Sequence, residues 1–189
     1  MKGIDARLIL ISGLPGSGKS TCGRWVSEFY KTAYIDYDTI VQRFMGDIYR
    51  KFYEELPYDE FCVTWRKCCY QTFWDVIAEN LKNGVCVTAS APLTKERQQQ
   101  DFFRRLRGSY NLECNILSIS MEVPEKILYT RMKDRQSPRD RQKIKDWDRY
   151  YRAQSQKTAW DPDLQLIYQE EQEYKRDRKI GEFLNRQNI

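Results

Sequence analysis

The stretch Gly13-Leu14-Pro15-Gly16-Ser17-Gly18-Lys19-Ser20 decides the fold of this 189-residue chain. It matches the pattern G-x-x-x-x-G-K-S, which is typical of loops that bind phosphate groups. An apolar run at residues 7–12 precedes it, and residues 21–31 carry apolar side chains at helical spacing. The sequence therefore predicts a strand, a glycine-rich loop and a helix in succession, which is the context that such a loop requires.

Each residue type in this loop suits the binding of a nucleoside triphosphate. Glycines let the backbone curl so that its N–H groups face the phosphates, and the positive end of the following helix adds to their attraction. Lys19 supplies a mobile positive charge for the transferred group, Ser20 offers a hydroxyl to Mg²⁺, and Thr21 offers a second one. We therefore expect ATP and Mg²⁺ as cofactors. The residues expected to bind ATP here are Gly13, Pro15, Gly16, Ser17, Gly18, Lys19, Ser20 and Thr21.

Composition indicates one globular domain. The chain has six cysteines without the spacing of a zinc site and no histidine, which excludes triads and metal sites built on histidine. No apolar run is long enough to span a membrane, and the first residues lead into the expected strand rather than into a signal peptide. We therefore expect a single P-loop domain over residues 1–189, without membrane attachment, in the cytoplasm.

The net charge of +5 is unevenly distributed. Residues 131–157 contain ten Lys or Arg against four Asp, which indicates an anionic ligand such as ATP, a nucleotide or a nucleic acid. Arg131, Arg135 and Arg139 recur every four residues, so the first two share one helical face. This face is either a solvated basic surface or a lid, at about residues 131–142, that closes on the triphosphate. We expect the lid, with Arg131 and Arg135 binding ATP and Arg135 stabilising the transition state.

Apolar runs alternate with segments of helical spacing along the chain. Strands are expected at residues 7–12, 32–36, 85–90, 113–121 and 165–168. Helices are expected at residues 21–31, through Ile40 and Phe44, at 59–82, at 94–107, from Pro124 onward, at 140–156 and at 170–186. This alternation predicts an α/β fold, a parallel sheet of about five strands flanked by helices, with residues 47–83 as a helical segment on the acceptor side.

Three polar residues follow the predicted strands at the edge where ligands of parallel sheets gather. These are Asp36, Asp38 and Ser90. Asp38 is the candidate base that accepts the proton of the acceptor hydroxyl, although an aspartate here can also simply cap the next helix. Asp36 can act on Mg²⁺ through water or bind the acceptor. Arg97, on the helix after the third strand, is a candidate for binding an anionic acceptor.

Aromatic residues are concentrated in the helical segment. They are Tyr49, Phe52, Tyr53, Tyr58, Trp65, Tyr70, Phe73 and Trp74. With the neighbouring cations they could stack the bases of a nucleic acid. At helical spacing such residues more often form a core, and we expect that here.

This arrangement resembles the P-loop kinases, and within them the kinase domain of polynucleotide 5′-hydroxyl kinases. The sequence from Tyr34 to Asp38 looks like the strand end of that family, and the resemblance implies that Asp38 is the catalytic aspartate. Val123-Pro124, followed by Arg131 and Arg135, looks like its helix leading to the lid arginines.

The resemblance breaks at two positions on the acceptor side. The family carries an arginine three residues after its catalytic aspartate, where this chain has Val41, with Arg43 nearby as a candidate replacement. It also carries an aspartate at the end of the third strand, where this chain has Ser90. Residues 87–92, with Arg97 beyond, look more like adenylylsulfate kinases. Phage kinases acting on hydroxymethyl-pyrimidine bases in DNA belong to the same broad group.

Three functions agree with these observations. The first is an ATP- and Mg²⁺-dependent kinase that phosphorylates a hydroxyl on a nucleic acid or nucleotide. The second performs the same chemistry on a small molecule, such as a nucleoside monophosphate or adenylylsulfate. The third is a P-loop ATPase switch, which would hydrolyse ATP slowly without an acceptor. The missing acidic residue at Ser90 leaves this function open, since many P-loop ATPases use an aspartate there for Mg²⁺. We expect the first, and the sequence leaves the acceptor and the oligomeric state open.

Overall fold

β1 (Arg7–Gly13) is the central strand of a five-stranded sheet in the computed structural model of the chain. The structure describes residues 6–137, 140–154, 157–168 and 173–187. The other strands are β2 (Ala33–Asp36), β3 (Val87–Ala91), β4 (Asn115–Glu122) and β5 (Leu164–Ile167). The order across the sheet is β2-β3-β1-β4-β5, and every neighbouring pair is parallel. The predicted α/β class and five-stranded parallel sheet are therefore confirmed.

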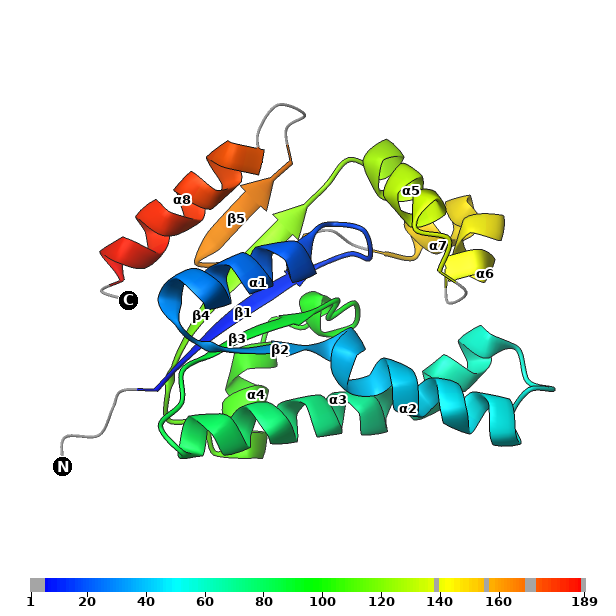
Figure 1. The fold of residues 1–189 in the computed structure, drawn as a ribbon, viewed down its shortest axis with the longest axis horizontal. Helices are drawn as coiled ribbons and strands as arrows, with labels where there is room; N and C mark the ends of the chain where they lie inside the picture. The colour runs from blue at the N-terminus through cyan, green and yellow to red at the C-terminus, as the bar shows by residue number, and fades with distance from the viewer. Residues whose placement is uncertain (1–5, 138–139, 155–156, 169–172, 188–189) are drawn as a thin grey trace.

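Helices cover both faces of this sheet (Figure 1). On one face lie α1 (Lys19–Tyr30) and α8 (Glu173–Arg186); on the other lie α3 (Tyr58–Lys82) and α4 (Phe102–Tyr110). The remaining helices are α2 (Tyr37–Phe52), η1 (Glu96–Gln98), α5 (Glu125–Asp134), α6 (Arg141–Lys145) and α7 (Trp147–Arg152). None of the described helices combines the length and the apolar character needed to cross a membrane.

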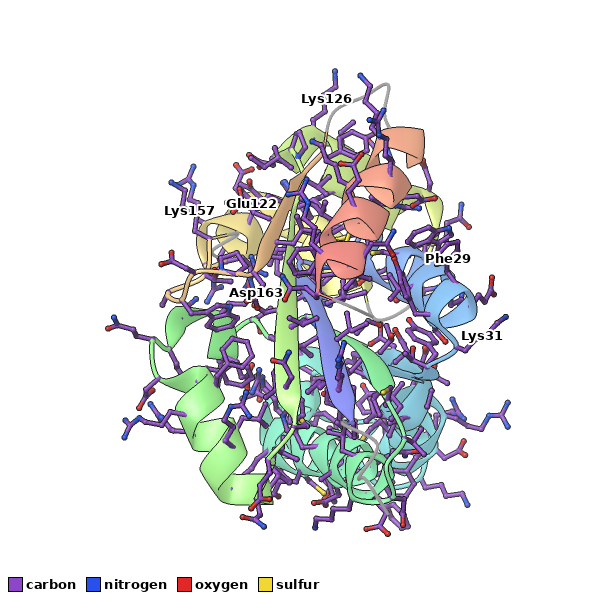
Figure 2. All side chains as sticks on the ribbon, turned by 90° about the vertical axis from the view of Figure 1, so that its left-hand side faces the viewer. Phe29, Lys31, Glu122, Lys126, Lys157 and Asp163 are labelled. Carbon is purple, nitrogen blue, oxygen red and sulfur yellow. The ribbon has the colours of Figure 1, made fainter. Side chains whose placement is uncertain are left out.

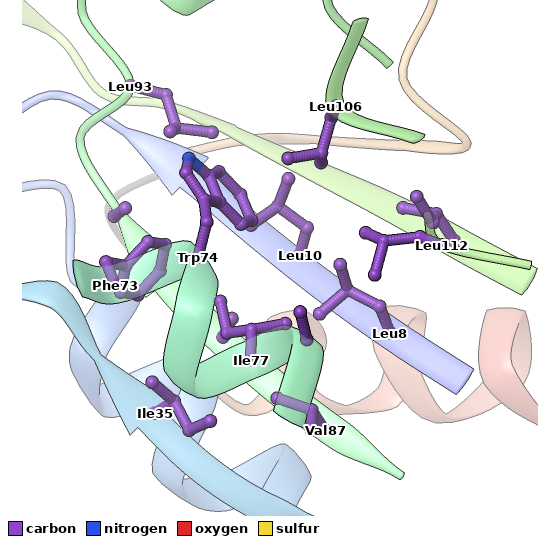
Figure 3. Close-up of a cluster of buried hydrophobic side chains, with 14 of the residues drawn as sticks. Leu8, Leu10, Ile35, Phe73, Trp74, Ile77, Val87, Leu93, Leu106 and Leu112 are labelled. Atoms are coloured by element: carbon purple, nitrogen blue, oxygen red, sulfur yellow. The ribbon is translucent and has the colours of Figure 1, made fainter. Parts of the chain in front are cut away.

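β1 reads as a continuous apolar run because both of its faces are buried. Leu8 and Leu10 point toward α3 and α4, where they join a cluster with Phe73, Trp74 and Ile77 (Figure 3). The alternate residues Ile9 and Ile11 point toward α1 and α8. This two-sided burial fixes the carboxyl end of β1, and with it the start of the glycine-rich loop.

Charged side chains surround this layered core. The labelled cations Lys31, Lys126 and Lys157 extend away from the sheet (Figure 2). This distribution agrees with the mean hydropathy of −0.77 for the chain.

Two predicted helices are interrupted in the structure. The helix expected at residues 94–107 appears as η1 and α4. The carbonyl of Arg97 accepts from the Ala159 amide at 2.6 Å, so it does not accept a hydrogen bond that would continue the helix. The helix expected at residues 140–156 divides into α6 and α7 at Asp146, whose backbone is not helical (φ −122°, ψ 55°). Pro138, Arg139 and residues 155–156 and 170–172 of the predictions lie outside the described residues.

Candidate active site

The glycine-rich loop joins β1 to α1 as the sequence predicts. Gly16 and Gly18 have φ values of 84° and 87°, in the left-handed region that other residues rarely adopt. The Ser17 amide donates to the Leu14 carbonyl at 3.1 Å, which closes the turn. The Ser17 hydroxyl is buried and has no hydrogen-bond partner among the described residues. An anion seated in the loop would supply that missing acceptor.

A cavity of about 400 Å³ opens beside this loop, a size that suits a small ligand. The loop and the first turn of α1 form its floor, including Lys19, which is 6 % exposed. The end of β4 and the end of β5 form an apolar wall, and α5 and α8 add basic side chains. Asp38 lines the same cavity from α2. The predicted donor loop and the predicted base therefore face one space.

Asp36 is the centre of a dense hydrogen-bond network at the end of β2. One carboxylate oxygen accepts from the hydroxyls of Ser20 (2.8 Å), Ser90 (2.6 Å) and Tyr34 (3.1 Å). The other accepts from the amide of Thr39 at 3.0 Å. Burial alone would raise the pKa of Asp36, but the bonds from Ser90, Ser20, Thr39 and Tyr34 hold it below its usual value. Asp36 is thus a buried carboxylate that stays charged and holds the hydroxyl of Ser20.

This network decides which aspartate caps α2. The Thr39 amide donates to Asp36, which is the N-cap residue, whereas Asp38 lies inside the first turn. The alternative that Asp38 only caps the helix is therefore wrong, because Asp36 has that role. Asp38 is half-buried and faces the cavity.

The same network contains a tyrosine that the sequence interpretation missed. The hydroxyl of Tyr34 lies within hydrogen-bonding distance of Ser90 (2.8 Å), of the Ser20 carbonyl (3.2 Å) and of Asp36 (3.1 Å), and it can donate its single proton to one of them at a time. Burial raises the pKa of Tyr34 to about 12. The hydrogen bond from Ser90 opposes this rise, and the negative charge of Asp36 adds to it. Its ring packs so closely on Gly23 of α1 that an added Cβ would lie 2.5 Å from the ring. Tyr34 thereby connects β2, β3 and α1 around Asp36.

Ser20 and Asp36 are the residues that would hold Mg²⁺ at this site. The Ser20 hydroxyl donates its proton to Asp36, so its lone pairs remain for a cation. Among the described residues, no three acidic or cysteine side chains group closely enough to bind a metal ion by themselves. The arrangement therefore fits a magnesium ion that takes most of its ligands from nucleotide phosphates and water.

Both predicted lid arginines line the cavity from α5 and its C-terminal end. Arg131 donates to the Gly16 carbonyl at 3.2 Å, and its guanidinium lies 4.7 Å from the centre of the Tyr168 ring. Arg135 forms an ion pair with Asp140, which is fully buried. The basic face is therefore turned toward the loop, and its second arginine is oriented by an acidic partner.

The structure brings together only some of the predicted acceptor residues: Asp36 and Ser90 are joined at 2.6 Å, whereas the two arginines lie elsewhere. Ser90 lies in the Asp36 network, whereas Arg43 is exposed on α2. Arg97 is 0 % exposed and donates to the Ser12 hydroxyl at 2.8 Å, so its side chain does not reach the surface in this conformation. An acceptor contact by Arg43 or Arg97 stays a prediction.

The aromatic residues of the 47–83 segment are mostly used in packing. Tyr70, Phe73 and Trp74 belong to the core under β1 and β3. Tyr49, Tyr53, Tyr58 and Trp65 surround Phe61 in a separate cluster between α2 and α3. Phe52, at 75 % exposure, is the exception. The expected core role of the aromatics is confirmed.

Comparison with known proteins places this geometry in a family. Residues 8–154 match the model of an AAA domain, AAA_33, over more than half of the chain. The chain belongs to this AAA domain family. The matched residues include the P-loop, Asp36, Asp38 and both predicted lid arginines, whereas β5 and α8 lie beyond them. No curated protein is similar enough in sequence to count as a relative.

Solved structures resemble the chain over nearly its whole length. A sugar kinase from Janibacter sp. has 14 % identity and a TM-score of 0.60, covering 95 % of each chain. The APS kinase CysC of Mycobacterium tuberculosis, solved with AMPPNP and APS, has 18 % identity and a TM-score of 0.58, covering 96 % of this chain and 98 % of its own. Shikimate kinase from Aquifex aeolicus has 17 % identity and a TM-score of 0.55, with the same coverage. At such low identities the similarity establishes the P-loop kinase fold.

Proposed function

We propose that this chain is a kinase that transfers the γ-phosphoryl group of ATP to a hydroxyl of a small molecule. The observation that carries the proposal is the single cavity that Lys19, both lid arginines and Asp38 line together. A nucleotide switch needs the phosphate loop but no base for an acceptor hydroxyl, which is the role that we give to Asp38 in the same cavity. The kinases among the similar structures support the same chemistry.

The proposed mechanism assigns one task to each group. The loop amides and Lys19 hold the β- and γ-phosphates, and Arg131 and Arg135 neutralise the charge that develops on the moving group. Asp38 accepts the proton of the acceptor hydroxyl while the hydroxyl oxygen bonds to the γ-phosphorus. The bond between the γ-phosphorus and the β–γ bridging oxygen breaks at the same time, and ADP leaves. When bound at Ser20, Mg²⁺ supplies further charge neutralisation.

The acceptor is proposed to be small rather than polymeric. The aromatic residues that could have stacked bases are packed between helices, apart from Phe52. Sugar, APS and shikimate kinases share the fold, and their names include small acceptors. A nucleic acid or nucleotide acceptor, which we expected from the sequence, has less support.

The test is transfer of labelled γ-phosphate from ATP, with Mg²⁺, to sugars, shikimate, adenylylsulfate, nucleoside monophosphates, DNA and RNA in parallel. Asp38→Asn should bind ATP normally and lose transfer by a factor of about 10² or more, since the positioned base is removed. Asp47→Asn, an exposed change on the same helix, is the matched control and should remain active. If only DNA or RNA became labelled, the acceptor would be a nucleic acid and the proposal of a small acceptor would be wrong. Full transfer by Asp38→Asn would show that Asp38 is not the base.

A further inference from the structure

The C-terminal helix contributes a basic wall to the cavity that the loop chemistry does not explain. Ile180 and Leu184 of α8 pack with Cys22 and Val26 of α1, and the two helices begin at the same edge of the sheet (Figure 1). The first half of α8 therefore lies beside the phosphate loop. Its basic residues at the cavity are Lys175, Arg176 and Lys179.

Two of these cations have no ion-pair partner among the residues that the structure describes. Arg176 is paired with Asp177, and Arg178, which does not line the cavity, is paired with Glu182. Lys175 and Lys179 are exposed and form no ion pair or hydrogen bond within the described part of the chain. They stand four residues apart, on one face of the helix, where like charges repel. A bound anion between them would remove that repulsion.

The rest of the cavity shows what kind of anion can reach them. Leu166, Ile167 and Tyr168 form an apolar strip between the loop and α8, and Arg131 lies over the Tyr168 ring. Such a strip suits a nucleotide base, while the loop holds the terminal phosphates. A nucleotide placed in this way has its ribose and its remaining phosphate near α8.

We infer that Lys175 and Lys179 form a second phosphate subsite for the nucleotide, outside the loop that holds the β- and γ-phosphates. Its ligand is a phosphate monoester or diester group, either the 5′ α-phosphate of the nucleotide or a phosphate on its ribose. The inference rests on the nucleotide binding of the proposed function and does not depend on transfer or on the acceptor.

The test measures nucleotide binding by calorimetry in low salt, without acceptor. The variant is Lys175→Gln/Lys179→Gln, and Arg178→Gln on the same helix is the matched control. The ligands are ATP, AMP, adenosine and adenosine 3′,5′-bisphosphate. We expect the double variant to bind the ligand whose phosphate lies between the two lysines about tenfold more weakly, as for two partly exposed charge contacts, and adenosine with unchanged affinity. Arg178→Gln should bind both like the wild type.

The ligands separate the two sources of the phosphate. If the 5′ α-phosphate is held, AMP loses the same factor as ATP. If a ribose phosphate is held, the bisphosphate loses it while AMP and ATP do not. An equal loss for adenosine, or no loss for any phosphorylated ligand, would overturn the subsite. A wild type that binds ATP but labels no acceptor would count against the proposed kinase and leave the subsite standing.

Discussion

The replacement Arg97→Met should make the protein more stable. The Arg97 side chain is fully buried, and among the described residues only Nη1 is bonded, to Ser12, while Nε and Nη2 have no partner. Burial lowers the pKa of Arg97 from 12.5 to about 10, against the weaker opposing attraction of Glu122. At about 1.4 kcal/mol for each pKa unit, the charged guanidinium costs the folded state about 3 kcal/mol.

Methionine removes that cost and keeps most of the length of the side chain. Loss of the hydrogen bond to Ser12 costs the variant about 1 kcal/mol. We therefore expect the free energy of unfolding to rise by about 2 kcal/mol at neutral pH. Because the pKa is depressed, both states are protonated at neutral pH and the penalty is fully present. This penalty disappears only as the pH rises from about 10, the pKa of Arg97 in the folded protein, toward 12.5, its pKa in the unfolded chain.

Urea denaturation at pH 7.5 measures the difference, and Arg104→Met is the matched control. Arg104 is 81 % exposed on α4, so its replacement should change stability by less than about 0.5 kcal/mol. Loss of more than 1 kcal/mol in Arg97→Met would refute the reasoning, because it would show that the buried charge is well compensated. If the charge is kept for function, the stabilised variant should also transfer phosphate more slowly.

Two further substitutions test the Asp36 network. Ser90→Ala removes a bond that keeps Asp36 charged, so it should cost about 1–2 kcal/mol at pH 7. The difference from wild type should shrink as the pH falls below about 4, where a depressed carboxylate loses its contribution; acid denaturation followed by circular dichroism measures it. Gly23→Ala should lower the melting temperature despite the helical preference for alanine, because its Cβ would meet the Tyr34 ring. Gly108→Ala, at a position where a Cβ would meet no atom within 4 Å, should raise the melting temperature. The opposite order would contradict the packing argument.

Local sequence signals predicted where the phosphate loop and the two arginines lie in the structure. The loop pattern required a strand before it and a helix after it, and β1 and α1 occupy those places. The spacing of Arg131 and Arg135 placed both on one face, and the structure turns that face to the cavity. These features depend on residues close together in the chain.

Features that depend on distant pairings were missed. The role of Tyr34 follows from the register that sets Asp36 beside Ser90 and from the absence of a side chain at Gly23. The four-residue spacing of Lys175 and Lys179 was visible in the sequence, but only the packing of α8 on α1 brings them to the loop. The break after η1 likewise depends on a segment sixty residues further on, through Ala159.

The strand order has a consequence for how such a protein can change over time. β4 and β5, with α5 and α8, lie on one side of β1, and β3 and β2, with α2 and the near end of α3, lie on the other. Substitutions in separate halves share few neighbours, so their effects on stability should add nearly independently. The half with β2 and β3, where we propose that the acceptor binds, can therefore diversify while the half with β4 and β5 is left alone. The hydrogen bonds of Ser20 with Asp36 and Tyr34 are places where changes must stay compatible with the phosphate loop.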